Sequence, residues 1–190
     1  MESPKPNSRL LPQPFGFSLL ELLVVIIIIS ALLGFAIEKL LKLQVQAERS
    51  SMESLIGTLQ SAIALTISEH IAKGKIPELK KYLNSNPMAL LANTPVNYLG
   101  SFGGPPENPE PGSWWYEKNS QTLVYLVLNQ EYFSAQSGNS GQKTRAKFKI
   151  IAVYDDNNSN GQFDQDDTLK GLRLSPSAIY QWSKNPTETF

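Results

Sequence analysis

The feature that most constrains this chain is one long apolar run near its N-terminus, FSLLELLVVIIIISALLGFAI at residues 17–37. It contains a single charged side chain, that of Glu21. As an α-helix with a rise of about 1.5 Å per residue, the run would extend about 32 Å, close to the roughly 30 Å hydrocarbon thickness of a bilayer. The apolar core of an ordinary secretory signal peptide is shorter, about 7–15 residues. We therefore expect residues 17–37 to form one transmembrane helix.

The carboxylate of Glu21 is costly in such a helix. A charged side chain within a transmembrane segment costs a few kcal/mol and by default has a partner and a function. One alternative is a Glu near the helix end that simply reaches the lipid headgroups. If the chain were cut before Phe17, however, the new α-amino group would place a positive charge at the helix end. That charge could neutralise the carboxylate of a neighbouring copy.

The segment GFSLLE at residues 16–21, followed by an aliphatic helix, resembles the class III signal sequence of type IV pilins and type II secretion pseudopilins. The resemblance implies that residues 1–16 are a leader, that a prepilin peptidase cuts between Gly16 and Phe17, and that Phe17 is then N-methylated. It also implies that Glu21 sets the register of subunits in a filament. Glu38 stands where many major pilins carry a helix-kinking proline, which favours a minor pilin or pseudopilin.

Topology and location also come from this resemblance, because the flanking charges do not discriminate. Lys5 and Arg9 precede the apolar run and Lys39 and Lys42 follow it, so the positive-inside rule gives no clear orientation. The resemblance implies a single-pass protein of the bacterial inner membrane with an extracytoplasmic C-terminal domain, which then enters a pilus or pseudopilus. Its partners would be the prepilin peptidase, other pilin or pseudopilin subunits and the inner-membrane assembly platform.

The helix is expected to continue well beyond the apolar run. Between residues 38 and 74 the apolar side chains recur at steps of three and four, which predicts an amphipathic helix with one wet face. No proline or paired glycine interrupts residues 17–73, and Gly74 is suited to the helix end. The periodic apolar positions are Met52, Leu55, Ile56, Leu59, Ala62, Ile63, Ile67 and Ile71.

The remainder of the chain predicts an antiparallel sheet after a variable connector. The connector, residues 75–112, contains two short predicted helices (76–83 and 87–92) and ends in the Pro/Gly-rich segment GGPPENPEPG. In residues 113–190, β-branched and aromatic runs predict a three-strand meander at 113–118, 122–129 and 146–154, with a shorter strand at 171–175 on its edge. The expected fold class is α+β and pilin-like, with one long N-terminal helix packed on a 3–4-stranded antiparallel sheet.

An acidic segment follows the third predicted strand. From residue 156 to 167 it resembles the calcium loop of an EF-hand, D-x-[DN]-x-[DN]-G, with Asp in place of Glu at the final position. Calcium takes six to eight oxygen ligands, and Gly161 would allow the sharp turn that such a loop needs. The alternative is a solvated hairpin of turn-forming residues. The calcium hypothesis assigns a structural ion to Asp156, Asn158, Asn160, Gln162 (through its backbone carbonyl), Asp164 and Asp167.

Composition restricts the function classes. Seventeen basic and seventeen acidic residues cancel without a basic block, so no direct nucleic-acid binding is predicted. Cysteine is absent and histidine occurs once, at His70, which is expected to stabilise the helix end or to be exposed. No serine-elbow, Walker or His-metal pattern is present, which argues against an enzyme.

Two functional hypotheses follow. The leading one is a structural subunit of a type IV pilus or type II secretion filament. The alternative is a membrane-anchored extracytoplasmic module that captures DNA, a glycan or a secreted substrate. Its sequence support is the adjacent Trp114 and Trp115, of which a strand should turn one inward and one outward, together with the acidic loop.

Overall fold

The structure is a computed structural model, and it describes residues 16–135 and 144–183. The chain divides into two compact units, Met1–Lys42 and Leu43–Phe190. The predicted leader, apart from Gly16, lies outside the described residues.

Helix α1 runs from Leu19 to Ala72, which confirms the predicted long N-terminal helix. It begins after Ser18, whose hydroxyl oxygen accepts a hydrogen bond of 3.1 Å from the backbone N–H of Glu21 and so satisfies one of the unpaired donors of the first turn. It ends at Ala72, two residues before Gly74, where φ is +64° and the backbone N–H donates to the carbonyl of Ile71. A positive φ favours glycine, so the helix stops where the sequence predicts.

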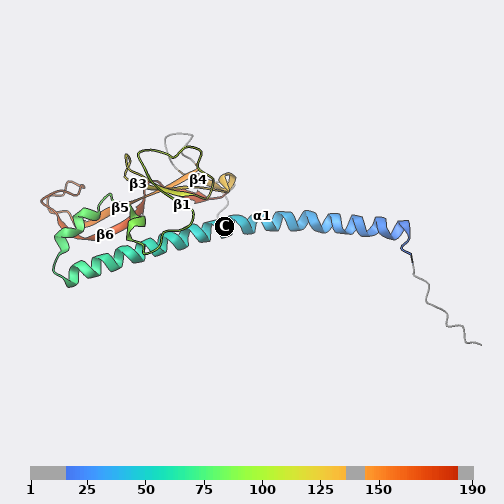
Figure 1. The fold of residues 1–190 in the computed structure, drawn as a ribbon, viewed down its shortest axis with the longest axis horizontal. Coiled ribbons are helices and arrows are strands. Elements are labelled where there is room, and N and C mark those ends of the chain that lie inside the picture. Colours follow the sequence, from blue (N-terminus) through green and yellow to red (C-terminus); the bar gives the residue numbers. More distant parts are fainter. Residues whose placement is uncertain (1–15, 136–143, 184–190) are drawn as a thin grey trace, which may run out of the picture. The chain divides into compact units, whose positions relative to one another are not determined.

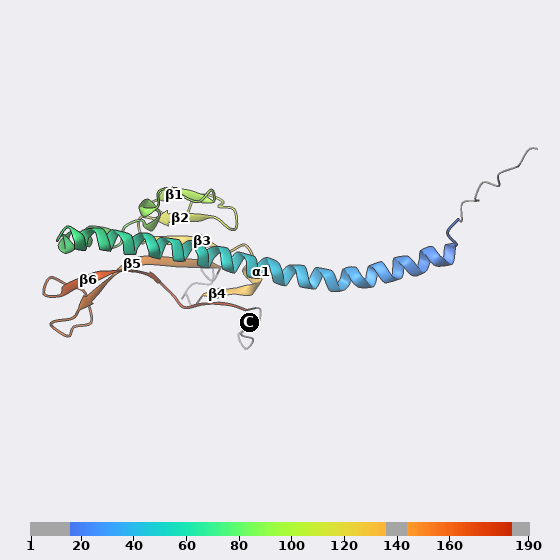
Figure 2. The same ribbon diagram turned by 90° about the horizontal axis from the view of Figure 1, so that it is seen from below.

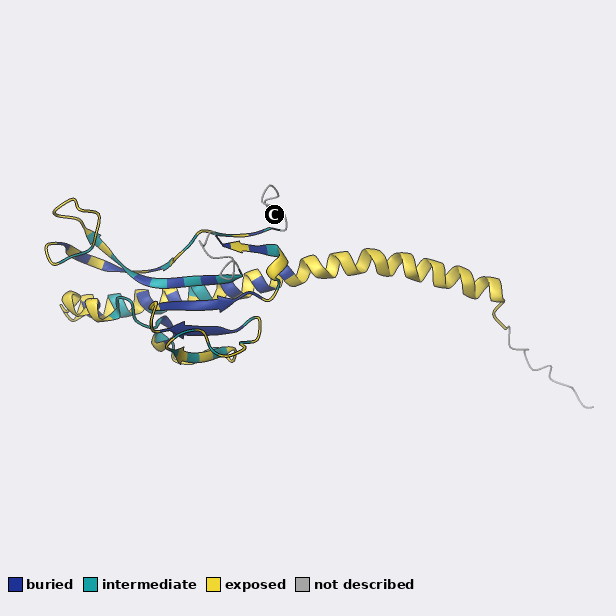
Figure 3. Cartoon of the chain, turned by 90° about the horizontal axis from the view of Figure 1, so that it is seen from above, coloured by how far each residue is buried: buried dark blue, intermediate teal, exposed yellow. Residues whose placement is uncertain are grey.

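In the first unit, every described residue of α1 is exposed, as the yellow stretch of helix in Figure 3 shows. The exposed side chains are mainly Leu, Ile, Val and Phe. Among the described residues α1 is the one helix long and apolar enough to cross a membrane, and none of its apolar window is buried within the protein. The first unit is therefore an apolar helix that needs a non-aqueous environment or a partner to cover it.

The second unit packs the rest of α1 against one face of a five-stranded sheet with the order β1-β2-β3-β5-β6 (Figure 1). Seen from below, this part of α1 lies across β3 and β5, with β1 and β2 on one side and β6 on the other (Figure 2). The strands are β1 (Tyr98–Phe102), β2 (Trp114–Glu117), β3 (Thr122–Leu126), β5 (Arg145–Asp155) and β6 (Thr168–Pro176).

The predicted antiparallel meander is confirmed. Strand β2 pairs with β3, β3 with β5, and β5 with β6, each pair antiparallel. The predicted edge strand is longer than expected, and the β5–β6 hairpin carries the acidic loop at its tip. A bulge between Val153 and Tyr154 interrupts the β5–β6 register just before this loop. The α+β class and the helix-on-sheet layout therefore stand as predicted.

Strand β1 was not predicted, and it comes from within the stretch that was expected to be a connector. It pairs with β2 in parallel, with Tyr98 opposite Trp114. The sequence signal is weak because the strand contains Gly100, whose φ of +111° few other residues adopt, and its register is irregular between Tyr98 and Ser101. The sheet thus has five strands and one parallel pair, where three or four antiparallel strands were expected.

A second, two-stranded sheet was also missed. Strands β4 (Phe133–Ala135) and β7 (Tyr180–Trp182) pair antiparallel, and their aromatic rings pack on one another. The ring centroids of Phe133 and Trp182 lie 5.0 Å apart in an edge-to-face arrangement, which is a favourable geometry. Three residues are too few for a recognisable strand pattern, so the pairing depends on contacts that only the folded chain provides.

The connector helices are short 3₁₀ segments, η1 (Ile76–Tyr82) and η2 (Pro87–Leu90). Each has a proline in its first turn, where the missing N–H costs nothing. The side chain of Asn86 caps η2 by accepting a hydrogen bond of 3.0 Å from the N–H of Met88. Both segments lie close to the positions that the sequence predicts.

The two faces of the large sheet have separate apolar clusters. The main core lies between α1 and the sheet and includes Met52, Leu59, Leu123, Phe148 and Ile150. A smaller cluster of Trp115, Val124 and Leu126, with Phe102 packed against it, lies apart from the main core. Because this second cluster covers the face of the sheet that is turned away from α1, less apolar surface of the sheet is exposed to water.

Candidate functional site

The predicted cleavage position lies just before α1. Gly16 and Phe17 are exposed and non-helical, and the side chain of Phe17 is 78% exposed. Because Ser18 caps the helix, Leu19 is the first helical residue and the peptide bond between Gly16 and Phe17 stays outside it. A bond in extended or irregular backbone is more accessible to a protease than one within a helix.

Glu21 lies in the first turn of α1, among exposed apolar side chains. Its backbone N–H donates to the hydroxyl of Ser18. In the described part of the chain its carboxylate makes no hydrogen bond and no ion pair. A carboxylate on an apolar helix is costly when it has no partner in its own chain. A positive charge from another molecule would therefore stabilise it.

The acidic loop folds into a compact turn whose carboxylates point back toward its own backbone. Asp156 accepts hydrogen bonds from the N–H of Asn160 through Oδ1 at 3.2 Å and from the N–H of Gly161 through Oδ2 at 2.8 Å. Ser159 and Gly161 adopt positive φ values of +59° and +73°. The turn is therefore held by Asp156 at its start and allowed by Gly161 in its middle.

Asp164 and Asp167 close the other side of the loop. Asp164 accepts hydrogen bonds through Oδ2 from the amide nitrogens of Asn158 at 2.8 Å and Asn160 at 2.6 Å. The hydrogen bond from Asn158, then those from the N–H of Asp166 and from Asn160, hold the pKa of Asp164 below its ordinary value. Asp167 is buried and accepts hydrogen bonds from the N–H groups of Asn157 and Asp164.

The acidic loop has the ligand types that a hard cation requires, but its side chains are not arranged around an ion. Its carboxylate and amide oxygens are the ligand types that calcium takes, and they belong to one turn. Within the described residues no group of three or more His, Asp or Glu side chains is arranged to hold a metal. Asn158 and Asn160 present their amide nitrogens to Asp164, so their side chains would have to rotate to offer oxygens to an ion.

The two adjacent tryptophans do not form an exposed aromatic surface. Trp114 is 2% exposed and packs in the main core, where its ring lies 4.6 Å from that of Tyr125. Trp115 turns to the other face, as alternation requires, yet it is 0% exposed. The guanidinium of Arg145 lies 5.5 Å from its ring. Neither indole offers a free face for stacking on a ligand, which removes the main sequence support for the binding-module hypothesis.

His70 lies in the last turn of α1 as predicted, and of the two expected roles, helix-end stabilisation or surface exposure, exposure is wrong because the residue is only 7% exposed. Its Nδ1 lies 2.8 Å from the carbonyl oxygen of Thr66, and its ring meets that of Tyr82 edge-on at 5.5 Å. The imidazole is thus a packing residue between α1 and η1.

Sequence reasoning missed Glu48, a carboxylate on the buried face of α1. It is 8% exposed and accepts four hydrogen bonds, which join α1 to the end of β3 and to the turn before η3 (Gln130–Tyr132). The donors are the hydroxyl of Tyr125, the backbone N–H groups of Leu128 and Asn129, and the side-chain amide of Asn129. Extending the apolar steps of three and four backward from Met52 would have reached Glu48 and Val45.

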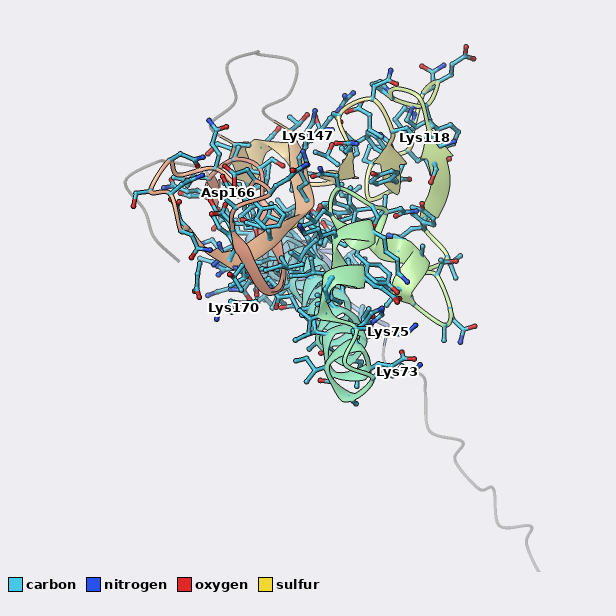
Figure 4. All side chains as sticks on the ribbon, turned by 90° about the vertical axis from the view of Figure 1, so that its left-hand side faces the viewer. Lys73, Lys75, Lys118, Lys147, Asp166 and Lys170 are labelled. Atoms are coloured by element: carbon cyan, nitrogen blue, oxygen red, sulfur yellow. The ribbon has the colours of Figure 1, made fainter. Side chains whose placement is uncertain are left out.

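Charged side chains are spread around the second unit. Figure 4 shows Lys118, Lys147 and Lys170 at separate places around the second unit. Lys147 lies 3.7 Å from Glu117 and Lys170 lies 2.8 Å from Asp155.

Comparisons with known proteins add no relative, because no family model, curated protein or solved structure matches the chain.

Proposed function

We propose that this protein is a structural subunit, a minor pilin or pseudopilin, of a type IV pilus or type II secretion filament. The observation that carries the proposal is the exposed apolar part of α1 with the unpartnered carboxylate of Glu21 in its first turn, directly after Gly16 and Phe17. An apolar helix that nothing in its own chain covers needs lipid or other helices. A single acid at its start needs a positive charge.

The assembly step follows from these two needs. While the helix is in the bilayer, lipid covers its apolar side chains. When subunits associate, van der Waals packing between helices and the rare polar contacts decide which arrangement is stable. A newly exposed α-amino group on Phe17 would pair with Glu21 of an adjacent copy, and the cost of leaving either charge alone in a low-dielectric surrounding fixes the axial register.

The proposed partners are a prepilin peptidase, other pilin or pseudopilin subunits and the inner-membrane assembly platform. The protein would lie in the bacterial inner membrane as a single-pass protein, with the second unit, Leu43–Phe190, on the extracytoplasmic side. No enzymatic activity and no direct nucleic-acid binding are part of this proposal.

Processing provides the experimental test. Cells with and without prepilin peptidase are compared by immunoblotting, and the N-terminus of the mature chain is identified by mass spectrometry. The expected result is a chain that starts at N-methylated Phe17 only when the peptidase is present. A chain of unchanged mobility in both strains, with residues 1–16 attached, would contradict the proposal.

We further propose that the acidic loop binds calcium as a structural ion. The support is the oxygen-rich turn at the tip of the β5–β6 hairpin, where Asp156, Asp164 and Asp167 lie in one loop and accept hydrogen bonds from its backbone N–H groups and Asn amides. Crowded carboxylates repel, and a divalent cation relieves that repulsion. Affinity of about 10⁻⁴–10⁻³ M, typical of extracellular modules, would suffice in a calcium-rich medium.

Thermal unfolding of the second unit, followed by tryptophan fluorescence, tests the calcium proposal. Millimolar calcium should raise the unfolding temperature of the wild type and of Asp166→Ala, whose carboxylate lies outside the assigned ligand set. It should have no effect on Asp164→Ala. Equal stabilisation of both variants, or an equal effect of magnesium on all three proteins, would argue against a specific calcium site.

A further inference from the structure

The acidic loop also contains the chain's single Asn-Gly dipeptide, Asn160-Gly161. Both residues are exposed. Asn-Gly is the dipeptide in which a backbone nitrogen reaches the preceding side-chain amide most easily, because glycine has no Cβ to hinder the approach and rotates freely about φ and ψ. Chemically, this is the position of the chain most prone to spontaneous deamidation.

The reaction needs the backbone nitrogen of Gly161 as a nucleophile, and that nitrogen is engaged in the folded loop. Its N–H donates a hydrogen bond of 2.8 Å to Oδ2 of Asp156. Attack requires the amide nitrogen to lose its proton. A carboxylate that accepts a hydrogen bond from this N–H stabilises the protonated form, because charge-assisted hydrogen bonds are about twice as strong as neutral ones.

The electrophile, the side-chain amide carbon Cγ of Asn160, is held in place as well. The side-chain oxygen of Asn160 accepts a hydrogen bond of 2.7 Å from the N–H of Gln162, and its amide nitrogen donates one of 2.6 Å to Asp164. Both ends of the side-chain amide are therefore fixed. Rotation of Cγ toward the nitrogen of Gly161 would break both hydrogen bonds at once.

We propose that Asn160 is a site of spontaneous deamidation through a succinimide, and that Asp156 restrains the reaction by holding the amide proton of Gly161. Solvent base removes this proton, and the nitrogen forms a bond to Cγ of Asn160. The side-chain nitrogen leaves as ammonia after taking a proton from water. One water molecule then opens the imide at either carbonyl, giving aspartate or isoaspartate. The net change is the replacement of the side-chain NH₂ by OH, with loss of ammonia.

The product damages the loop that restrained the reaction. Conversion of Asn160 to an acid removes its hydrogen bond to Asp164 and puts two carboxylates where an amide and a carboxylate met. Isoaspartate also adds a carbon to the backbone beside Gly161, where φ is +73°. The modification is thus irreversible for the turn, and it adds one negative charge to the tip of the β5–β6 hairpin. This inference does not depend on the proposed function.

The experiment compares deamidation rates in the full-length protein, purified in detergent with a metal chelator. Wild type, Asp156→Ala and Asp166→Ala are incubated at neutral pH. Peptides that contain Asn160 are followed by mass spectrometry for the mass increase and for isoaspartate. Asp166 is the matched control because it belongs to the same loop, while its carboxylate accepts no hydrogen bond from Asn160 or Gly161.

The expected result is deamidation at Asn160 at least about tenfold faster in Asp156→Ala than in Asp166→Ala, the size expected from loss of one charge-assisted hydrogen bond. Asn119, followed by Ser120 and exposed on another loop, is an internal control in the same digests. Its rate should be equal in all three proteins, which separates local release from global unfolding. Equal rates at Asn160 in the two variants would overturn the proposal, as would acceleration of Asn119 together with Asn160.

Discussion

The carboxylate of Glu48 on α1 accepts a hydrogen bond of 2.9 Å from the hydroxyl of Tyr125 on β3, 77 residues later in the chain. The same carboxylate accepts the backbone N–H groups of Leu128 and Asn129 at 2.6 and 2.9 Å. Helix packing alone permits sliding between similar apolar positions, whereas directed hydrogen bonds do not. Glu48 therefore fixes the position of the sheet along its part of α1.

Removing the charge of Glu48 should destabilise the second unit. In Glu48→Gln the side chain keeps its size, but one oxygen becomes an NH₂ group that faces N–H donors. We expect a loss of about 1.5–3 kcal/mol in the free energy of unfolding, the range for a hydrogen bond to a charged group. Urea unfolding followed by tryptophan fluorescence measures it, because all three tryptophans lie in this unit.

Glu53 provides the matched control for that measurement. It lies farther along the same helix, half exposed, and pairs with Arg49 at 2.8 Å. An exposed i,i+4 pair contributes about 0.3–0.5 kcal/mol, so Glu53→Gln should leave the urea midpoint almost unchanged. If both variants shift the midpoint equally, the carboxylate of Glu48 does not have the role assigned to it here.

Alkaline pH should weaken the same contact. Burial first, and then the charge of Glu48, raise the pKa of Tyr125 above its ordinary value. Tyrosine in the unfolded chain loses its proton at a lower pH than Tyr125 in the folded chain, so stability falls as pH rises through the unfolded pKa toward the folded one. Urea midpoints between about pH 8 and pH 11 should decline in the wild type and decline less in Tyr125→Phe. Parallel curves would contradict this assignment.

The hydrogen bonds within the acidic loop should be visible in its acid titration. Asn158→Ala removes the largest cause of the lowered pKa of Asp164, so that pKa should rise toward its ordinary value. Any stability that Asp164 provides is present above the unfolded pKa and is lost as pH falls through the folded one. Carboxyl NMR shifts against pH give the titration. Asn157→Ala is the control, because the side-chain amide of Asn157 donates to Asp166 and Thr168 and not to Asp164. If Asn157→Ala raised the pKa of Asp164 as much as Asn158→Ala does, the assignment would be wrong.

Trp115 should behave as a core residue. Trp115→Ala removes a fully buried indole from the smaller cluster, which should cost about 3–5 kcal/mol in unfolding free energy. Leu128→Ala, at a side chain that is 58% exposed, should cost far less. Urea unfolding compares the two. Full stability of Trp115→Ala, with loss of capture of a ligand, would restore the binding-module hypothesis.

The long helix and the central meander could be read from the sequence because their signals are local. The apolar run, the steps of three and four from Met52, and the β-branched runs of the middle strands each report the periodicity of one element. Gly74 marks the C-terminal end of the helix through its backbone preference. The N-terminal end, expected at residue 17, lies at Leu19, because Ser18 caps the helix. Such features depend on neighbours within a few residues, so a single sequence is enough to predict them.

The features that were missed depend on contacts between distant residues. Strand β1 forms because β2 offers a parallel edge, although Gly100 weakens its local pattern. From the sequence alone, a charged residue such as Glu48 is expected on the solvent-exposed face of the helix. In the folded chain it is buried, because its carboxylate accepts hydrogen bonds from the backbone N–H groups of Leu128 and Asn129. Burial of Trp115 likewise depends on Phe102, which lies in a segment with no predicted structure.

The sequence located the residues of the acidic loop but not their hydrogen bonds. The spacing from Asp156 to Asp167 predicts convergence of their oxygens on one ion. In the fold, hydrogen bonds link Asp156 to Asn160, Asn160 to Asp164, and Asp164 to Asp167, while no group of three acidic side chains in the described residues is arranged to hold a metal. Which atoms face inward depends on the rotation of the Asn158 and Asn160 amides, for which a sequence pattern has no information.

The most direct test of the whole account is incorporation of Glu21→Gln into filaments, compared with that of Glu38→Gln. Glu38 is the other carboxylate in the part of α1 that belongs to the first unit. Each variant is expressed beside the wild type, and its ratio to the wild type is measured in membranes and in sheared filaments. We expect both variants in membranes at wild-type levels, with Glu21→Gln depleted at least about tenfold from filaments, as loss of a buried charge partner worth a few kcal/mol requires. Equal recovery of Glu21→Gln and Glu38→Gln in filaments would contradict the account.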